Sequence, residues 1–198
     1  NGELRITIPQ HSNIDAMVDF IGTNMVWIKS QMRKKIPLVR ITNGTSVPIF
    51  GYERKILAKK NCLTNFYFTR TSLIIPETTL PFNDQISSVI YQIATQYFTE
   101  ISLEYAEKLN VTFDKISIKD TKSRWGSCSS DKKLMFSWRL IMAPKKVSSY
   151  VAAHEIAHLK HMNHSKNYWK VVNFLSPDYK VHRNWLHIHG KHLHRYFF

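Results

Sequence analysis

Four histidines and one glutamate fall within eleven positions, in the stretch His-Glu-Ile-Ala-His-Leu-Lys-His-Met-Asn-His at residues 154–164. On an α-helix, residues four apart lie about 40° from each other and one turn apart along the axis. His154 and His158 would therefore project side by side, and Glu155 would point about 100° away from His154. The stretch predicts a helix that carries two adjacent imidazoles, with a carboxylate beside them.

Two adjacent imidazoles can bind one metal ion, with nitrogens at about 2.0–2.1 Å if the ion is zinc. Glu155 would then lie beside the ion, where a carboxylate can accept a proton from a metal-activated water. The spacing of these residues therefore indicates a metal centre that has its own base.

A hydrolytic zinc site needs a third protein ligand and an open position for water. No glutamate follows the one in this stretch, so the candidates are His161, His164 and Asp178. Three ligands along a straight helix from His154 to His161 would stretch over about 10 Å, too far to converge on one ion. We therefore favour His164, which requires the helix to end first, and Asn163 tolerates the left-handed conformation of such an end.

Hydrophobic periodicity predicts an α+β fold with two parts, residues 1–80 and residues 81–198. The first part is expected to be β-rich with one helix: a strand at 3–9, a helix capped at Ser12 that extends to Met32, and two or three strands after it. Isoleucines and methionines at helical spacing in this helix indicate core packing rather than a cofactor site.

The second part is expected to begin with a long helix from about Asp84 to Leu109, ended by Asn110. A short strand and a hairpin with its polar turn at 129–133 should follow. Pro144 suits the first position of the histidine-carrying helix, and two shorter helices are expected after it.

The chain has a formal net charge of +14, and from Lys132 onward it holds twelve basic and two acidic residues, a net charge of +10. Such a field favours anionic partners such as nucleic acid. With two cysteines there is no disulfide framework, which favours a reducing, cytoplasmic location. No apolar run approaches the about 18–20 residues of a membrane helix, so no membrane association is expected.

Three segments carry a family resemblance: KSRWGSCSSDKKLMFSWRLIMAP at 122–144, YVAAHEIAHLKHMNHSKNYWKVV at 150–172, and PDYKVHRNWL at 177–186. Together they resemble the YgjP-like metallopeptidase family of zinc-dependent hydrolases. The earlier segments WIKSQMRKKIP and TNGTSVPIFGYERKI fit the same family, so the resemblance spans nearly the whole chain.

The resemblance implies a zincin-like domain with one Zn²⁺ ion. It implies that His154, His158 and His164 are the zinc ligands and that Glu155 is the catalytic base. It also implies kinship with SprT-like and WLM-type proteases, which act on proteins attached to DNA. Some members of the family are instead described as nucleotide pyrophosphohydrolases that act on UTP.

The hairpin before the histidine helix is the candidate for substrate binding, because zincins hold an extended peptide against an edge strand. Gly126 would permit close backbone approach, Trp125 lies beside it, and Arg124 could contact a carboxylate or phosphate. The alternative is a purely structural hairpin, in which Trp125 is core and Arg124 forms a surface ion pair.

Three residues are open candidates for stabilising a developing oxyanion: Tyr150, Tyr168 and Arg139. Cys128 is expected to be a small buried apolar residue rather than a nucleophile or ligand. Two positions differ from the residues usual in the resembled family: Ser137 replaces asparagine, and Tyr168 replaces phenylalanine.

We expect a zinc metallopeptidase in which metal-activated water, deprotonated by Glu155, attacks a peptide bond, with DNA-associated proteins among the candidate substrates. The alternatives are a UTP pyrophosphohydrolase and a basic nucleic-acid-binding module with a structural metal. Five further histidines near the end are expected to be exposed helix residues rather than a second metal site: His182, His187, His189, His192 and His194.

Overall fold

The computed structural model describes residues 13–33, 36–60, 62 and 65–198, and the chain divides into two units, Asn1–Pro37 and Leu38–Phe198. The strand expected at 3–9 and the cap expected at Ser12 lie outside the described residues.

The first unit contains two helices, α1 (Ile14–Thr23) and α2 (Met25–Arg33), where the sequence predicted one. Asn24 separates them: its backbone N–H and its side-chain amide both donate to the Phe20 carbonyl. The side chain thus competes with the helical bonding pattern, which is the usual way asparagine ends a helix. Of the described side chains in the expected apolar stripe, only Ile28 is buried, so most of the stripe forms no core within the first unit itself.

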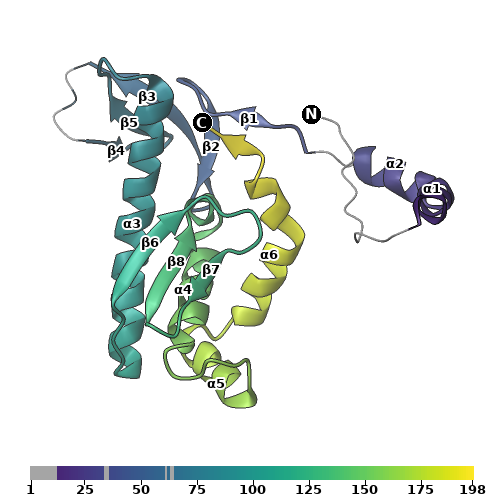
Figure 1. The fold of residues 1–198 in the computed structure, drawn as a ribbon. Coiled ribbons are helices and arrows are strands. Elements are labelled where there is room, and N and C mark those ends of the chain that lie inside the picture. The colour runs from purple at the N-terminus through teal and green to yellow at the C-terminus, as the bar shows by residue number, and fades with distance from the viewer. Residues whose placement is uncertain (1–12, 34–35, 61, 63–64) are drawn as a thin grey trace. The chain divides into compact units, whose positions relative to one another are not determined.

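The second unit is organised around α3 (Phe82–Leu109), a 28-residue helix that runs past a four-stranded and a three-stranded sheet (Figure 1). The predicted end of this helix is confirmed, because Asn110 adopts the left-handed conformation at φ 50° and ψ 53°. Its backbone N–H then donates to the carbonyls of Ala106 and Glu107. The buried face of α3 consists of Ile86, Val89, Ile90, Ile93, Ala94, Tyr97, Phe98, Ser102, Tyr105, Ala106 and Leu109.

Two small sheets flank this helix. One has the order β2-β3-β5-β4, formed by β2 (Ser46–Ile49), β3 (Tyr52–Lys59), β5 (Ser72–Pro76) and β4 (Tyr67–Phe68). The other has the order β6-β8-β7, formed by β6 (Lys115–Lys119), β8 (Lys133–Ser137) and β7 (Gly126–Cys128). Strand β7 pairs antiparallel with β8 and lies at the edge, so the predicted hairpin is confirmed. A third, parallel pair joins β1 (Val39–Arg40) to β9 (Tyr196–Phe197).

The chain then forms a 3-10 turn, η1 (Trp138–Met142), and three helices: α4 (Lys145–Ala157), α5 (Lys166–Leu175) and α6 (Tyr179–Leu193). Pro144 immediately precedes the first residue of α4. Helix α4 packs against α3, α5, α6, η1 and strand β7. Its alanines and other buried residues lie on every side, which is typical of a helix at the centre of a domain.

The second unit extends across the division that the sequence placed between residues 80 and 81. Strands β2, β3 and β5 contribute Val47, Ile56 and Leu73 to the same hydrophobic core as α3 and α4. These strands cannot bury their apolar faces alone, so residues 38–80 fold with the rest of the unit. The architecture is mixed α and β, and none of the described helices is long and apolar enough to cross a membrane.

Replacing Phe98 by Ala should destabilise the second unit strongly. Phe98 is fully buried in α3 and stacks on Phe136 of β8, with ring centroids 4.3 Å apart and an interplanar angle of 9°. We expect the free energy of unfolding to fall by about 3–5 kcal/mol in urea denaturation. Leu103→Ala on the exposed face of the same helix is the control and should cost under about 0.5 kcal/mol. Equal losses in the two variants would contradict the placement of α3.

Candidate metal centre

The histidine helix ends earlier than expected. α4 stops at Ala157, with His158 as its C-cap residue, and the next residues form turns in which Leu159 donates to Ile156 and Lys160 to Ala157. Among the described non-glycine residues, positive φ occurs only at Phe50, Asn110 and Lys132, so the predicted left-handed turn at Asn163 is wrong. The reversal is spread over the turns after His158 instead.

Ser165 restarts the helical chain directly after His164. Its side chain accepts a hydrogen bond from the Tyr168 backbone N–H at 3.3 Å, which caps the N-terminus of α5. Tyr168 is fully buried, and its hydroxyl donates to the backbone carbonyl of His154 at 2.9 Å. This bond ties α5 to α4 and thereby returns His164 to the face that carries His154.

Three imidazoles converge as a result. The Nε2 atoms of His154 and His164 are 3.3 Å apart, and one ligand atom from each of His154, His158 and His164 lies within 4.8 Å of the others. Two nitrogens bound to one zinc at tetrahedral geometry are separated by about 3.3–3.4 Å. The donors therefore fit a metal ion, and the described residues hold no other group of three or more potential ligands, so His161 and Asp178 are not part of one.

Two of these histidines, His154 and His158, favour the neutral form that binds metals. Burial lowers the pKa of His154 to about 3, and a proton on its ring would also be repelled by the positive charge of Arg183 and by any proton on the neighbouring imidazoles. Burial also lowers the pKa of His158, although its bond to the His161 backbone partly opposes the shift. The Nδ1 atom of His158 lies 3.2 Å from the His161 carbonyl oxygen. A donor at Nδ1 leaves Nε2 with a free lone pair for a metal.

The Glu155 side chain lies against the backbone of the edge strand β7. A Cβ atom added at Gly126 would be 2.5 Å from Glu155 Oε1 and 2.8 Å from its Cγ, closer than side-chain atoms can approach. Glycine at this position therefore creates the space that the carboxyl occupies. Glu155 is only 5% exposed; burial raises its pKa to about 8, and the positive charge of Arg124 partly opposes this.

A cavity of about 190 Å³ opens beside this carboxyl, between strand β7, α4 and α6. Trp125 and Gly126 form one wall, while Tyr150, His154 and Glu155 form another. Helix α6 closes the cavity with Leu186 and packs on Trp125 through Gly190 and His194. The structure thus brings Trp125 and Gly126 to the cavity, whereas Arg124 is exposed and acts on Glu155 through its charge.

The three candidates for oxyanion stabilisation differ in position. Arg139 is buried, and its guanidinium binds Asp120 at 3.2 Å and the Tyr196 carbonyl at 3.0 Å. The hydroxyl of Tyr168 is used by the His154 carbonyl. Tyr150 lines the cavity, and no hydrogen bond of its hydroxyl is recorded in the part of the chain that the structure describes. Of the three, only Tyr150 lines the cavity.

Cys128 is partly buried, and burial together with the charge of Glu155 raises the pKa of its thiol to about 11. A thiol with so high a pKa is a poor nucleophile or ligand near neutral pH. The five histidines near the C-terminus lie on or just after α6, and none belongs to a ligand group within the described residues.

Sequence reasoning did not identify Trp169 and Arg183 as neighbours of the cluster. The Trp169 ring lies 5.9 Å from that of His154 and 5.8 Å from that of His164, and stacks on Tyr179 at 5.2 Å. The Arg183 guanidinium lies 5.2 Å from the Trp169 ring centroid. The adjacent aromatic pair at 168–169, which begins four residues after the last histidine of the motif, is the one sequence signal that pointed here.

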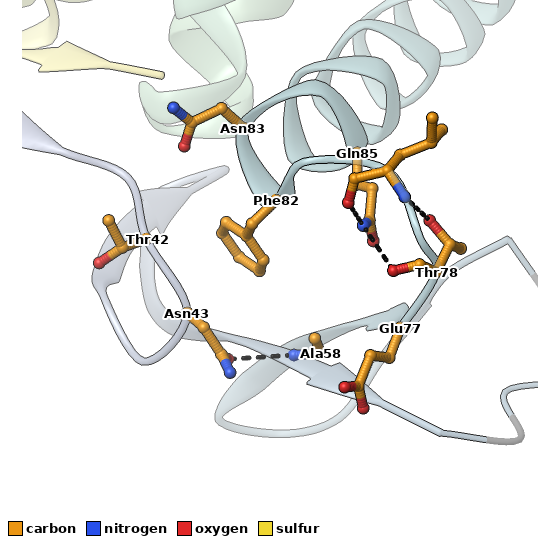
Figure 2. Close-up of a pocket in the computed structure, with 9 residues that line it drawn as sticks. Thr42, Asn43, Ala58, Glu77, Thr78, Phe82, Asn83 and Gln85 are labelled. Atoms are coloured by element: carbon orange, nitrogen blue, oxygen red, sulfur yellow. Dashed lines mark hydrogen bonds between the residues drawn. The ribbon is translucent and has the colours of Figure 1, made fainter.

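A second cavity, of about 360 Å³, lies away from the histidines, at the start of α3 (Figure 2). Its one carboxylate is Glu77. Asn43 accepts a hydrogen bond from the Ala58 backbone N–H at 3.1 Å, and the Gln85 amide donates to the Thr78 carbonyl at 3.4 Å. Because these polar groups bind neighbouring backbone, they hold loops together rather than converge on a ligand.

Removing the His164 imidazole should weaken metal binding. We expect His164→Ala to lower zinc affinity at least about 100-fold, since loss of a mere outer hydrogen-bond partner of a ligand already costs about 10–100-fold. Zinc titration against a competing chelator measures the effect. His161→Ala, three residues away, is the matched control and should bind zinc normally. Full zinc affinity in His164→Ala would show that another residue is the third ligand.

The buried Glu155 carboxyl should make the metal-free protein less stable as pH rises. Its folded pKa of about 8 lies above the unfolded value of 4.5, so between these values the folded state holds a proton that the unfolded state has lost. Stability should therefore fall by about 2 kcal/mol from pH 6.5 to 8.5 in urea denaturation with chelator present. His154, with a folded pKa of about 3 and an unfolded value of 6.5, contributes only about 0.4 kcal/mol of the opposite sign over this range.

The Glu155→Gln variant carries no ionisable group at this position, so its stability should not fall from pH 6.5 to 8.5 and should rise slightly, because folding lowers the pKa of His154 and His158. Parallel pH profiles for the two proteins would show that Glu155 is not the cause.

Comparison with known proteins identifies the family to which the chain belongs. No curated protein matches the chain. Among solved structures, the metallopeptidase zymogen of Pyrococcus abyssi abylysin is similar, with 20% sequence identity and a TM-score of 0.42, over 51% of this chain and 99% of that one. The YgjP-like metallopeptidase domain matches residues 1–189 of this chain. The chain therefore belongs to the YgjP-like metallopeptidase family and is a metal-dependent hydrolase with a peptide or protein substrate.

Proposed function

We propose that this protein is a zinc-dependent peptidase with a zincin-like active site on α4. The observation that carries the proposal is the convergence of His154, His158 and His164 next to a buried glutamate, in a cavity bordered by an edge strand. Three neutral imidazoles are a typical donor set for catalytic zinc, which keeps its fourth position open.

Zinc bound by these three imidazoles would supply Lewis-acid chemistry, lowering the pKa of a water molecule and polarising a carbonyl. Glu155 is the base in this proposal: its carboxylate accepts the proton of the attacking water and returns it to the leaving amine nitrogen. Its raised pKa suits a group that must both accept and release a proton near neutral pH. Tyr168 and Trp169 hold the imidazole rings in place by packing against them.

The substrate would lie along β7. This strand is at the edge of the described sheet, so its outer backbone groups can pair with an extended peptide. Gly126 keeps the strand close to Glu155, and Trp125 borders the cavity in which the scissile bond would lie. The Tyr150 hydroxyl is proposed to donate to the carbonyl oxygen as negative charge develops there.

A second candidate reaction is pyrophosphate release from UTP. Arg124 and Arg183 both act electrostatically on residues of the site, and phosphates need cationic partners. The same basic character supports a proposal that the peptidase acts on proteins associated with DNA. The cytoplasmic location that cysteine usage favours also stays a prediction. We rank peptide hydrolysis first because an edge strand, rather than a phosphate-binding loop, borders the cavity.

Glu155→Gln should retain zinc and lose turnover. Glutamine has nearly the same shape but cannot accept the proton, and a general base contributes about 10²–10⁴-fold to the rate. Zinc content is measured by metal analysis, and turnover by mass spectrometry of a random peptide library incubated with the zinc-loaded protein, with UTP assayed in parallel. Retained peptide cleavage in the variant would sink the mechanism; release of pyrophosphate from UTP alone would favour the second candidate.

Gly126→Ala tests the space that holds the base. The backbone at this position is not left-handed, so alanine is tolerated there, but its Cβ must displace the Glu155 side chain. A displacement of about 1 Å costs about 100-fold in rate, and zinc content should not change. Ser127→Ala is the control, because the next residue of a strand points to the opposite face. If both variants cleave at the wild-type rate, Gly126 does not position the base.

A further inference from the structure

Helix α6 presents one basic face to the rim of the metal centre. Leu186 of this helix lines the cavity beside Glu155, and Gly190, one turn on, packs against Trp125. Arg183 lies one turn before Leu186, about 5 Å along the axis. Its guanidinium lies 5.2 Å from the ring centroid of Trp169, and the Trp169 ring lies 5.8 Å from that of His164, so one aromatic ring separates Arg183 from the histidine cluster.

The Arg183 guanidinium is positioned by an aromatic ring rather than by an acid. It lies 5.2 Å from the ring centroid of Trp169, and this ring also contacts those of His164 at 5.8 Å and Tyr179 at 5.2 Å. A cation over a ring face is oriented while its N–H groups stay available. The ion pairs recorded among the described residues do not include Arg183, and the residue is exposed. It is thus an arginine with an anchored position and, within the described part of the chain, no ion-pair partner.

The surroundings of Arg183 are open and positively charged. It borders a shallow hollow of about 400 Å³ along α6, together with Tyr179, Lys180, Asn184 and His187. No carboxylate among the described residues lines this hollow.

We propose that Arg183 binds a carboxylate of the peptide substrate next to the scissile bond and so makes the enzyme selective for peptides that carry negative charge there. The planar guanidinium matches a carboxylate with two parallel hydrogen bonds, which a lysine cannot form. The carboxylate is either an acidic side chain or the free C-terminus of the peptide. This inference rests on the proposed peptidase function and names its substrate class.

The test measures binding rather than turnover, in the zinc-loaded Glu155→Gln protein. Three pools of random octapeptides labelled with an uncharged dye serve as probes: one glutamate per peptide with an amidated C-terminus, glutamine in its place with an amidated C-terminus, and glutamine with a free C-terminus. UTP is a fourth ligand, measured by competition. Fluorescence anisotropy gives the affinity of each pool for three zinc-loaded proteins, all of which carry Glu155→Gln. The first keeps Arg183, the second carries the charge-retaining change Arg183→Lys, and the third carries the uncharged change Arg183→Gln.

We expect the glutamate pool or the free-C-terminus pool to bind about tenfold more tightly than the neutral pool. Arg183→Gln should erase that difference and leave the affinity of the neutral pool and the zinc content unchanged, while Arg183→Lys should keep part of it. Lys191→Gln, elsewhere on the exposed surface of α6, is the control and should keep all of it. The pool that shows the preference identifies which carboxylate is bound.

The proposal is overturned if Arg183→Gln weakens all three pools equally, if the preference survives in that variant, or if only the affinity for UTP falls. Turnover is scored separately with the wild-type protein. A preference for carboxylate without any peptide cleavage would refute the peptidase function and keep the binding site, whereas cleavage without the preference would refute the site and keep the function.

Discussion

The hydrogen bond from the Tyr168 hydroxyl to the His154 carbonyl holds the metal centre together. Helix α4 ends at Ala157, and the chain must reverse before His164 can return to its first histidine. Ser165 begins a new helix, and Tyr168 at its third position anchors that helix to α4 at 2.9 Å. Because the phenol ring is fully buried among the three imidazoles, their separation is set before any metal arrives.

The Glu155 carboxyl depends on a contact of a different kind, with the backbone of a residue that has no Cβ. Glu155 follows His154 on α4, but the space that its side chain occupies exists only because Gly126, on the edge strand β7, has no Cβ. The contact buries the carboxyl and raises its pKa. A bound cation nearby would favour the ionised form, so burial by β7 and charge at the histidines oppose each other. That balance is what a group that accepts and then releases a proton requires.

Local physics explains which parts of the fold the sequence could predict. The apolar period of α3 and the left-handed Asn110 are encoded within a few residues, and both were found where expected. The spacing of His154 and His158 is local in the same sense. The break at Asn24 and the early end of α4 were missed, because side-chain competition and packing against other helices override periodicity there. A division between residues 80 and 81 was expected from hydrophobic periodicity, but shared burial joins the strands to α3.

Contacts between distant segments were beyond sequence reasoning. The cover of Glu155 by Gly126 joins residues 29 positions apart. The placement of Arg183 over Trp169 depends on how α6 crosses α4 and α5. Neither can be read from spacing along the chain, and both bear on chemistry rather than on stability. The family match over residues 1–189 supports metal-dependent peptide hydrolysis in general, while these contacts concern how this chain would perform it.

The most direct test of the central claim is X-ray absorption spectroscopy at the zinc edge of the zinc-loaded protein. The account predicts one zinc per chain, with three imidazole nitrogens at about 2.0–2.1 Å and one further oxygen from water. A sulfur ligand at about 2.3 Å, or fewer than three imidazoles, would contradict the convergence of His154, His158 and His164 on one metal ion.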